Sequence, residues 1–286
     1  MIKPFDGFAI KKSGQVIVEN FGGWETRNES SITLIKAAIE KYNIGSFDWI
    51  LVNTGDASID YKKANHPLFS YCTDTNDYSF CCPDFAFDHW KQTGLDDYEE
   101  TRLKITAMNE PPLTDKLGWR GANTHPNRKI LVETIKSPGL DIEWVHWNRQ
   151  NPQKLTASNF ISFEDQIKTW RYLIDIEGNG YSARLKLLLA SPRVVFVQDR
   201  PFKDLCFETM KPWEHFVPIR RDFSDLLLML FYISQNPALE ESIKKNARAY
   251  SQEYLTRDAA IKKWAELLSK HAGSSNRSLE PIFASA

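Results

Sequence analysis

The segment Tyr172–Val197 most strongly constrains the fold of this chain. An apolar run, Tyr172–Ile176, ends at a Gly-Asn-Gly turn, and a helical apolar pattern begins near Arg184. A second apolar run, Val194–Val197, follows directly. Strands that alternate with helical patterns are typical of βαβ units and parallel sheets. The segment therefore predicts an α/β fold.

The turn between these two strands has residues suited to an anion. The first turn of a helix has unpaired N–H groups and the positive end of the helix dipole. Gly178 and Gly180 allow positive φ angles and a close approach to the backbone. An arginine can hold a diphosphate through two parallel hydrogen bonds. We expect Gly180, Tyr181, Ser182 and Arg184 to bind a phosphate group, and the alternative is a tight turn with a solvated arginine.

Three motifs follow one another along the chain. They are RGANTHPNRKIL at 120–131, GNGYSARLKLLLAS at 178–191 and KPWEHFVPI at 211–219. In this order they resemble glycosyltransferase family 90, which includes protein O-glucosyltransferases, fungal capsule xylosyltransferases and bacterial lipopolysaccharide-modifying transferases. The resemblance covers residues 117–260, and the N-terminal third matches only loosely.

The resemblance implies that the first motif forms a second wall of a nucleotide-sugar site. The residues of this wall are Arg120, Gly121, Asn123 and Thr124. The family pattern reads R-G-S-R-T, so its second arginine is replaced by Asn123 here. This replacement removes one cation from the wall. Either Arg128 takes over its contact, or the preference for the donor changes.

Glycosyl transfer with inversion also needs a base that removes the proton of the acceptor hydroxyl. The run 48–53 reads as a buried strand, and Asp56 follows it after a turn that contains Gly55. The catalytic aspartate of the family follows a similar strand and turn, which implies Asp56 as the base. The alternative is that Asp56 caps the next turn. The competing carboxylates are Asp60, Asp84 and Asp88.

Trp90 and His215 are candidates for acceptor contacts or for structural positions. The resemblance implies an aromatic-rich acceptor loop around Trp90, where the indole would stack on a sugar, and core packing is an equal alternative. The family also has a histidine in the third motif. A histidine beside Trp213 and Phe216 is more typical of a hydrogen-bonded structural residue.

No metal or other cofactor is expected beyond the nucleotide-sugar substrate. His89, His125 and His146 have no partner at metal-ligand spacing, and Glu177 reads as a structural residue at the end of a strand. The cysteines are Cys72, Cys81, Cys82 and Cys206. They form no C-x-x-C pair, so neither a zinc site nor a disulfide framework is indicated. This cysteine usage favours a reducing, cytoplasmic location.

Composition excludes several classes of function. The chain has 286 residues and a formal net charge of −1, so no electrostatic field favours nucleic acid. The first residues contain no signal peptide, and no apolar run is long enough for a transmembrane helix. These features, with no ER-retention tail, favour the bacterial branch of the family. The lysines of the last helices read as solvated surface, and the alternative is peripheral contact with an anionic inner membrane.

Local patterns predict the order of the elements. A hairpin is expected around Ser13–Gly14, a helix over 31–42, a strand over 48–53 and irregular structure over 57–101. Further helices are expected over 126–135, 163–170, 224–235, 239–254 and 257–271, and strands over 141–147, 172–176 and 194–197. Periodicity, caps and turn residues carry these predictions.

Three parts are expected. Residues 1–112 form an acceptor-side α/β domain with the base, residues 113–255 a Rossmann-like nucleotide-sugar domain, and residues 256–286 a C-terminal helix with a loose tail. The resemblance implies the GT-B arrangement, in which two Rossmann-like domains face a central cleft.

The expected function is metal-independent, inverting transfer of glucose or xylose from a UDP-sugar to a surface glycan such as the lipopolysaccharide core. A protein that binds a nucleotide sugar or glycan without turnover is the alternative that the loss at Asn123 leaves open. A phosphorylase or hydrolase on the same frame is a third possibility.

Overall fold

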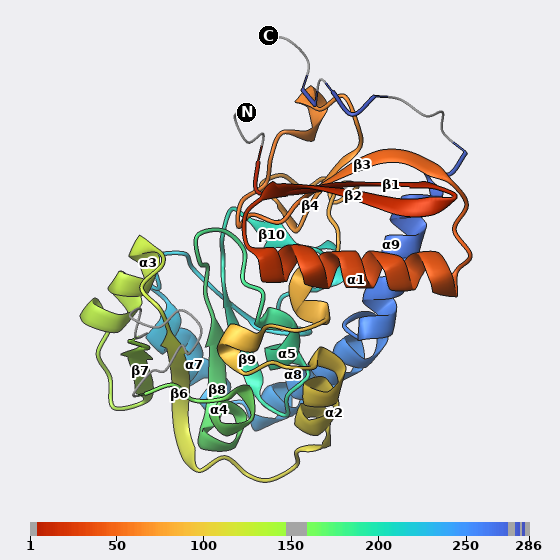
Figure 1. Cartoon of the computed structure of the whole chain (residues 1–286). Helices are drawn as coiled ribbons and strands as arrows, with labels where there is room; N and C mark the ends of the chain where they lie inside the picture. Colours follow the sequence, from red (N-terminus) through yellow and green to blue (C-terminus); the bar gives the residue numbers. More distant parts are fainter. Residues whose placement is uncertain (1–4, 147–158, 274–277, 281, 284–286) are drawn as a thin grey trace. The chain divides into compact units, whose positions relative to one another are not determined.

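The computed structural model describes residues 5–146, 159–273, 278–280 and 282–283. They divide into two compact units. Unit 1 contains the described residues of Met1–Trp90, Pro201–Glu208 and Thr256–Ala286, and unit 2 contains those of Lys91–Arg200 and Thr209–Leu255 (Figure 1). These units differ from the three expected parts, since the chain returns to unit 1 twice.

Unit 1 contains a four-stranded sheet in the order β2-β1-β3-β4. Its strands are β1 (Gly7–Ser13), β2 (Gln15–Gly22), β3 (Phe47–Asn53) and β4 (Leu68–Ser70). The predicted hairpin is confirmed, and its turn needs a glycine because Gly14 has a φ of 73°. β1 is antiparallel to β2 and β3, and only β3 and β4 are parallel. Unit 1 therefore does not have the parallel sheet of a Rossmann-like domain that the sequence predicted.

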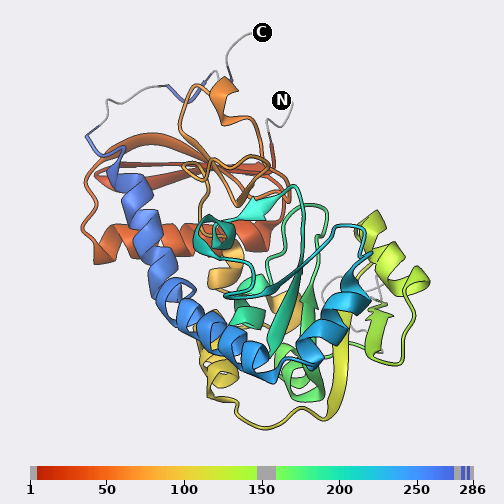
Figure 2. The ribbon, with the colours of Figure 1, turned by 180° about the vertical axis from the view of Figure 1, so that it is seen from behind.

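Helix α1 (Glu25–Lys41) packs against α9 (Arg257–Ser269) within unit 1 (Figure 2). The buried face of α1 includes Leu34, Ile35 and Ala38, as the periodicity predicted. The helix begins six residues earlier than expected, because its first turns are polar and gave no apolar signal. Ser31 in these turns is buried, and its hydroxyl lies 2.6 Å from the Tyr71 hydroxyl.

The expected irregular region contains short elements. They are η1 (Tyr61–Lys63), β5 (Cys72–Thr73), η2 (Phe85–Phe87), η3 (Lys91–Thr93) and α2 (Tyr98–Ala107). β5 pairs with β10 (Lys203–Asp204), which returns from much later in the chain. Helix α2 was not predicted, although Asp97 is a typical N-cap and accepts a hydrogen bond from the Glu100 N–H at 2.8 Å. Helix α6 (Cys206–Thr209) follows β10.

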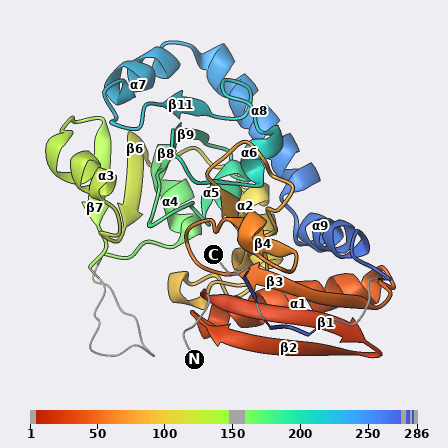
Figure 3. The ribbon, with the colours of Figure 1, turned by 90° about the horizontal axis from the view of Figure 1, so that it is seen from above.

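Unit 2 contains a five-stranded sheet in the order β11-β9-β8-β6-β7, with every pairing parallel (Figure 3). Its strands are β6 (Thr114–Gly121), β7 (Leu140–Trp144), β8 (Trp170–Asp175), β9 (Val194–Gln198) and β11 (Val217–Ile219). The predicted α/β fold with a parallel sheet is confirmed. The expected strand over 141–147 ends at Trp144, and residue 147 lies outside the described residues.

Helices lie between these strands along the chain or follow the last of them. They are α3 (Pro126–Lys129), the π-helical turn η4 (Ile130–Thr134), α4 (Phe163–Thr169), α5 (Leu185–Leu189), α7 (Leu226–Ser234) and α8 (Pro237–Tyr254). Each lies within two or three residues of a predicted helix, and α5 begins one residue after Arg184, where a helical pattern was expected, but has only five residues. No described helix has the length and apolar character needed to cross a membrane.

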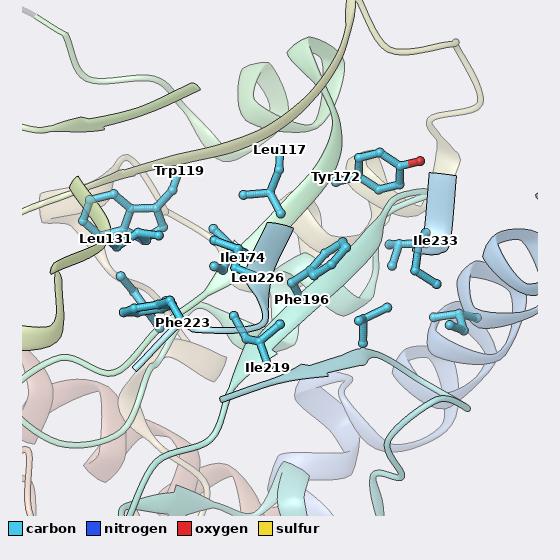
Figure 4. Close-up of a cluster of buried hydrophobic side chains, with 14 of the residues drawn as sticks. Leu117, Trp119, Leu131, Tyr172, Ile174, Phe196, Ile219, Phe223, Leu226 and Ile233 are labelled. Carbon is cyan, nitrogen blue, oxygen red and sulfur yellow. The ribbon is translucent and has the colours of Figure 1, made fainter. Parts of the chain in front are cut away.

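One core of unit 2 lies between the sheet and the helices of one face. Leu117, Tyr172, Ile174 and Phe196 from the strands meet Leu226 and Ile233 from α7 (Figure 4). Side chains alternate between the two faces of a strand. Because Tyr172 and Ile174 point into this core, Asp175 at the end of β8 points to the opposite face.

Candidate functional site

The order of the strands in unit 2 locates a candidate site. Numbered along the chain, the five strands lie in the order 2-1-3-4-5, and the order reverses between β6 and β8. In open parallel sheets, ligands bind beyond the carboxyl ends of the strands at this reversal. β6 ends at Gly121 and β8 ends at Asp175. The first two family-like motifs begin at these strand ends, so the topology brings them together.

Arg184 joins the two loops. Its Nη1 donates to the Arg120 carbonyl oxygen at 2.9 Å, and its Nη2 donates to the Ile174 carbonyl oxygen at 3.1 Å. Its Nε lies 3.4 Å from Asp175 Oδ1, and its guanidinium lies 5.5 Å from the centre of the Trp119 ring. Only 12% of the side chain is exposed, and this burial lowers its pKa. The expected solvated alternative for Arg184 therefore does not apply.

Three of the five N–H groups of the Arg184 guanidinium make these bonds. The other two make no hydrogen bond to the described part of the chain. They remain as donors at the carboxyl edge of the sheet.

Ser182 and Asp175 lie beside Arg184 in the candidate site. The Ser182 hydroxyl donates to Asp175 Oδ1 at 2.6 Å, and Arg200 Nη2 donates to Asp175 Oδ2 at 2.5 Å. All of these side chains are buried, and so is Tyr181. The buried carboxylate at the end of β8 was not a predicted site residue. Its place in the last position of a buried strand, before the glycine turn, was the available signal.

The glycine turn differs in detail from the prediction. Gly178 has no positive φ, and its position lies close to side chains of the neighbouring loop. A Cβ there would lie 3.3 Å from Arg128 Nη2 and 3.8 Å from Thr124 Oγ1. The helix that follows is too short for a large dipole, since α5 spans only Leu185–Leu189. Side chains, rather than a helix terminus, supply the positive charge of this site.

Arg128 connects the same two loops from the other side. Its Nη1 donates to the Ala122 carbonyl oxygen at 2.9 Å, and its Nε donates to the Glu177 carbonyl oxygen at 2.8 Å. Its guanidinium lies 5.5 Å from the centre of the Trp119 ring. The loop that contains Asn123 and Thr124 is thus held against the Gly178 turn by a cation only a few residues after Asn123.

Arg120 has a different environment from the one expected for a phosphate ligand. Its Nη2 donates to Asp141 Oδ1 at 2.7 Å, and its guanidinium lies 5.0 Å from the Trp170 ring. Burial opposes the ionisation of Asp141, but hydrogen bonds from Trp170 and Arg120 lower its pKa below the ordinary value. Arg120 reaches Arg184 through its backbone carbonyl oxygen. Contact between its guanidinium and a nucleotide stays a prediction, as does contact by Gly121 beside it.

A second buried carboxylate lies at the same edge of the sheet. Glu177 Oε1 accepts from Arg221 Nε at 3.0 Å and from the Asn127 side-chain amide, and His125 Nδ1 lies 3.6 Å away. The Glu177 N–H donates to Gln198 Oε1 at 3.0 Å. Glu177 was expected to be structural, and these contacts give it that role. Arg221, with half of its side chain exposed, is a cation at this edge of the sheet that was not predicted from the sequence.

His215 is held inside unit 2. Its Nδ1 accepts from the Lys211 N–H at 2.9 Å, and its ring lies 4.8 Å from the Tyr250 ring. Burial lowers the pKa of His215 below its ordinary value of 6.5. These contacts match the structural alternative, and an acceptor contact stays a prediction.

In unit 1, Asp56 follows β3 in a turn with many hydrogen bonds. The Asn53 side chain accepts from the Gly55 N–H at 3.0 Å and donates to the Ala57 carbonyl oxygen at 2.7 Å. Asp56 Oδ1 lies 2.8 Å from Arg27 Nη1, and 31% of the Asp56 side chain is exposed. Arg27 was missed because it lies in the polar first turns of α1, before the predicted start of the helix.

The competing carboxylates have structural contacts. Asp60 caps η1 and Asp84 caps η2, since each side chain accepts a hydrogen bond from a backbone N–H. Asp88 pairs with His89 at 2.9 Å and with Arg257 at 3.0 Å. Trp90 is partly buried, and its ring packs edge-on against Phe85, with the two ring centres 5.5 Å apart.

The four cysteines are buried, free thiols. Burial raises the pKa of Cys81 to about 12 and the pKa of Cys82 well above its ordinary value. Such thiols are inert, because the thiolate is the reactive form. The described residues contain no group of three or more His, Cys, Asp or Glu side chains that could hold a metal ion.

The chain is similar in sequence to a family of known enzymes. Residues 41–277 match the sequence model described as glycosyl transferase family 90. Human protein O-glucosyltransferase 3 is 23% identical over 77% of this chain and 46% of its own length. The O-glucosyltransferase LpsA of Dichelobacter nodosus is 27% identical over 54% of this chain and 47% of its own.

The chain thus spans about half the length of these curated relatives. A glycosyltransferase structure from Rickettsia africae ESF-5 aligns with a TM-score of 0.45 and 11% identity, over 87% of this chain and 82% of that one.

Proposed function

Because the chain belongs to glycosyl transferase family 90, we propose that it is an inverting, metal-independent glycosyltransferase. In this proposal it moves glucose or xylose from a UDP-sugar to a surface glycan such as the lipopolysaccharide core. The observation that carries the proposal is the meeting of Arg184, Ser182 and the 120–124 loop where the strand order reverses in unit 2.

The role of Arg184 follows from its remaining donors. A UDP leaving group develops negative charge on its diphosphate as the glycosidic bond breaks, and fixed cations stabilise that charge. Arg184 is held by three protein bonds, so its two other N–H groups have a defined direction. A bond from a buried guanidinium to a phosphate oxygen is strong because it is charge-assisted. Cationic side chains in this role would make a metal ion unnecessary.

Arg128 and Arg221 support the same proposal. Both lie at the carboxyl edge of the sheet, where Arg128 binds the Ala122 and Glu177 carbonyl oxygens and Arg221 binds the Glu177 carboxylate. In this proposal Arg128 supplies the charge that the arginine at position 123 supplies in the family pattern. Asn123 and Thr124 then contribute polar contacts to the nucleotide or sugar.

Asp56 is the proposed base. It is a partly exposed carboxylate in a turn that Asn53 holds rigidly, and its Oδ1 is oriented by Arg27. A single base that deprotonates the acceptor hydroxyl, with direct displacement of UDP, inverts the configuration at the anomeric carbon. In this proposal unit 1 binds the acceptor, with Trp90 as a candidate contact, and unit 2 binds the donor, with His215 as a candidate contact to the nucleotide or the acceptor.

The relatives favour glucose as the donor sugar, because two of them are named O-glucosyltransferases. A surface glycan made at the inner membrane would require a cytoplasmic enzyme with peripheral membrane contact. Lys244, Lys245, Lys262 and Lys263 are the cations proposed for that contact. Two of them also have partners within their own units, since Lys244 pairs with Glu241 and Lys263 with Glu208.

Thermal unfolding in the presence of ligands tests the proposal. A ligand that binds only the folded state raises the melting temperature. UDP, UDP-glucose and UDP-xylose should do so with and without EDTA, and GDP-mannose and CMP-sialic acid should not. Incubation with UDP-glucose and bacterial lipopolysaccharide should then release UDP. Nucleotide binding without transfer would identify a binding protein instead, and release of free glucose without acceptor would identify a hydrolase.

A further inference from the structure

We propose that Asp175 is a positioning residue of the nucleotide-sugar site, which acts on the nucleotide through Arg184 and Ser182. The inference rests on the proposed function, because it concerns how the same site is held. Asp175 is the last residue of β8, and its exposed fraction is 0%. A buried carboxylate is costly unless donors surround it. The donors that surround this one are side chains of the candidate site.

Three side chains donate to Asp175 from two segments of the chain. Ser182 Oγ donates to Oδ1 at 2.6 Å, and Arg184 Nε lies 3.4 Å from the same oxygen. Arg200 Nη2 donates to Oδ2 at 2.5 Å. Ser182 and Arg184 lie on either side of Ala183, directly before α5, so a single carboxylate sets the rotamers of two neighbouring candidate ligands. Asp175 is too deeply buried to contact a phosphate group itself. A carboxylate would also repel a phosphate group, because both carry negative charge.

The remaining bonds of Arg184 explain why this position matters. Its two Nη atoms bind the backbone carbonyl oxygens of Arg120 and Ile174, which lie at the ends of the two strands where the order reverses. Carbonyl oxygens alone fix two points of the guanidinium, and the Asp175 contact at Nε fixes the third. A site with a charged group held at three points loses less entropy when a ligand binds.

Asp175→Asn tests the proposal, with Glu240→Gln as the matched control. Glu240 is also a buried carboxylate of unit 2, and it accepts from Arg171 Nη2 at 2.8 Å and from the Tyr172 hydroxyl at 3.2 Å. Arg171 and Tyr172 lie near the start of β8, so Glu240 marks the opposite end of the same strand. Both substitutions keep the shape of the side chain and remove one buried charge. Both are therefore expected to lower the melting temperature.

Calorimetric titration with UDP separates the two variants at a temperature where both are folded. The dissociation constant should rise by about tenfold or more in Asp175→Asn and stay within about twofold of wild type in Glu240→Gln. In the background of Arg184→Ala, Asp175→Asn should weaken UDP binding by a clearly smaller factor than in wild type, because the part of its effect that passes through Arg184 is already lost. For UDP-glucose, KM should follow the same pattern.

Wild-type affinity for UDP in Asp175→Asn would overturn the inference and leave the proposed function intact. An equal loss of UDP affinity in Glu240→Gln would also overturn the inference, because the loss of any buried ion pair of unit 2 would then be enough to weaken binding. A wild-type protein that binds no uridine nucleotide would instead overturn the proposed function, and this inference with it. If Asp175→Asn does not fold, Asp175→Glu provides the comparison, because it keeps the charge and displaces the carboxylate by one methylene group.

Discussion

Arg27 Nη1 lies 2.8 Å from Asp56 Oδ1, so the proposed base is paired with a cation from the first turns of α1. The same nitrogen donates to the Thr54 carbonyl oxygen at 3.1 Å, and the guanidinium lies 4.9 Å from the Phe85 ring. These contacts hold the arginine in place. Arg27 of α1 therefore binds both the Asp56 carboxylate and the backbone of the turn that follows β3.

Asp56→Asn should abolish sugar transfer while the dissociation constant of UDP stays within about twofold of wild type. The amide keeps the shape of the carboxylate and cannot accept the acceptor proton, so the loss falls on kcat. Release of UDP from UDP-glucose with acceptor measures the rate, and calorimetry measures the affinity. Unchanged turnover would remove Asp56 as the base and direct attention to other carboxylates of unit 1.

Arg27→Ala should lower kcat by about tenfold or more and leave the KM for UDP-glucose near its wild-type value, because the substitution loosens Asp56 and changes no residue of the proposed nucleotide site. Arg257→Ala is the matched control. Arg257 makes an equivalent ion pair with Asp88, at 3.0 Å, on the same unit. Equal losses of kcat in the two variants would indicate a general effect on unit 1 and contradict an anchoring role for Arg27.

Arg184→Ala should weaken UDP binding by about 2 kcal/mol, which corresponds to about thirtyfold, as expected for charge-assisted hydrogen bonds to a poorly solvated anion. Arg171→Ala is a suitable comparison, since Arg171 stacks on Tyr172 at 5.1 Å and pairs with Glu240 away from the carboxyl edge of the sheet. Titration of both variants with UDP measures the two dissociation constants. If Arg184→Ala binds UDP as tightly as wild type, the diphosphate lies elsewhere.

Gly118→Ala should destabilise unit 2 severely. A Cβ at this position would lie 1.7 Å from Trp170 Cδ2, and the indole is fully buried against β6. Overpacking of this kind costs about 3 kcal/mol or more, or roughly 6 °C in melting temperature for a chain of this size. At Gly139 a Cβ would lie 3.6 Å from Leu230 Cδ2 and 3.8 Å from Ser137 Oγ, which are ordinary contact distances. Gly139→Ala should therefore melt close to wild type, and a similar fall in both variants would refute the packing argument.

Stability should decline as the pH falls below about 6.5, partly through His215. Burial lowers its pKa in the folded protein below the ordinary value of 6.5, so the unfolded chain binds more protons between the two values. The stabilising contribution is complete above the unfolded pKa and is lost as the pH falls through the folded one. His215→Gln should flatten the melting temperature between pH 7 and pH 5. An unchanged slope would show that other groups, such as the partly buried His271, control it.

Local pattern was sufficient to predict much of unit 2. The apolar runs at 172–176 and 194–197 and the helical periods between them depend only on neighbours in sequence, and β8, β9, α7 and α8 formed where expected. Helices with polar buried faces have a weaker apolar pattern in the sequence. The first turns of α1 and the whole of α2 were missed because their buried faces include serine, threonine and arginine.

The candidate site shows a similar division. The resemblance to the family implied that Ser182, Arg184 and the 120–124 loop belong to one site, and in the fold these segments follow strands that end at the same edge of the sheet. Only the tertiary structure decided which atoms of these residues meet: Arg120 approaches Arg184 through its carbonyl oxygen, while its guanidinium binds Asp141.

The pairing of Arg27 with Asp56 and the packing of α9 on α1 were likewise decided by the folded chain. Period and turn chemistry are local and can be read from the sequence. Side-chain partners that are distant in sequence depend on which elements become neighbours, and that is settled by the packing of the whole unit.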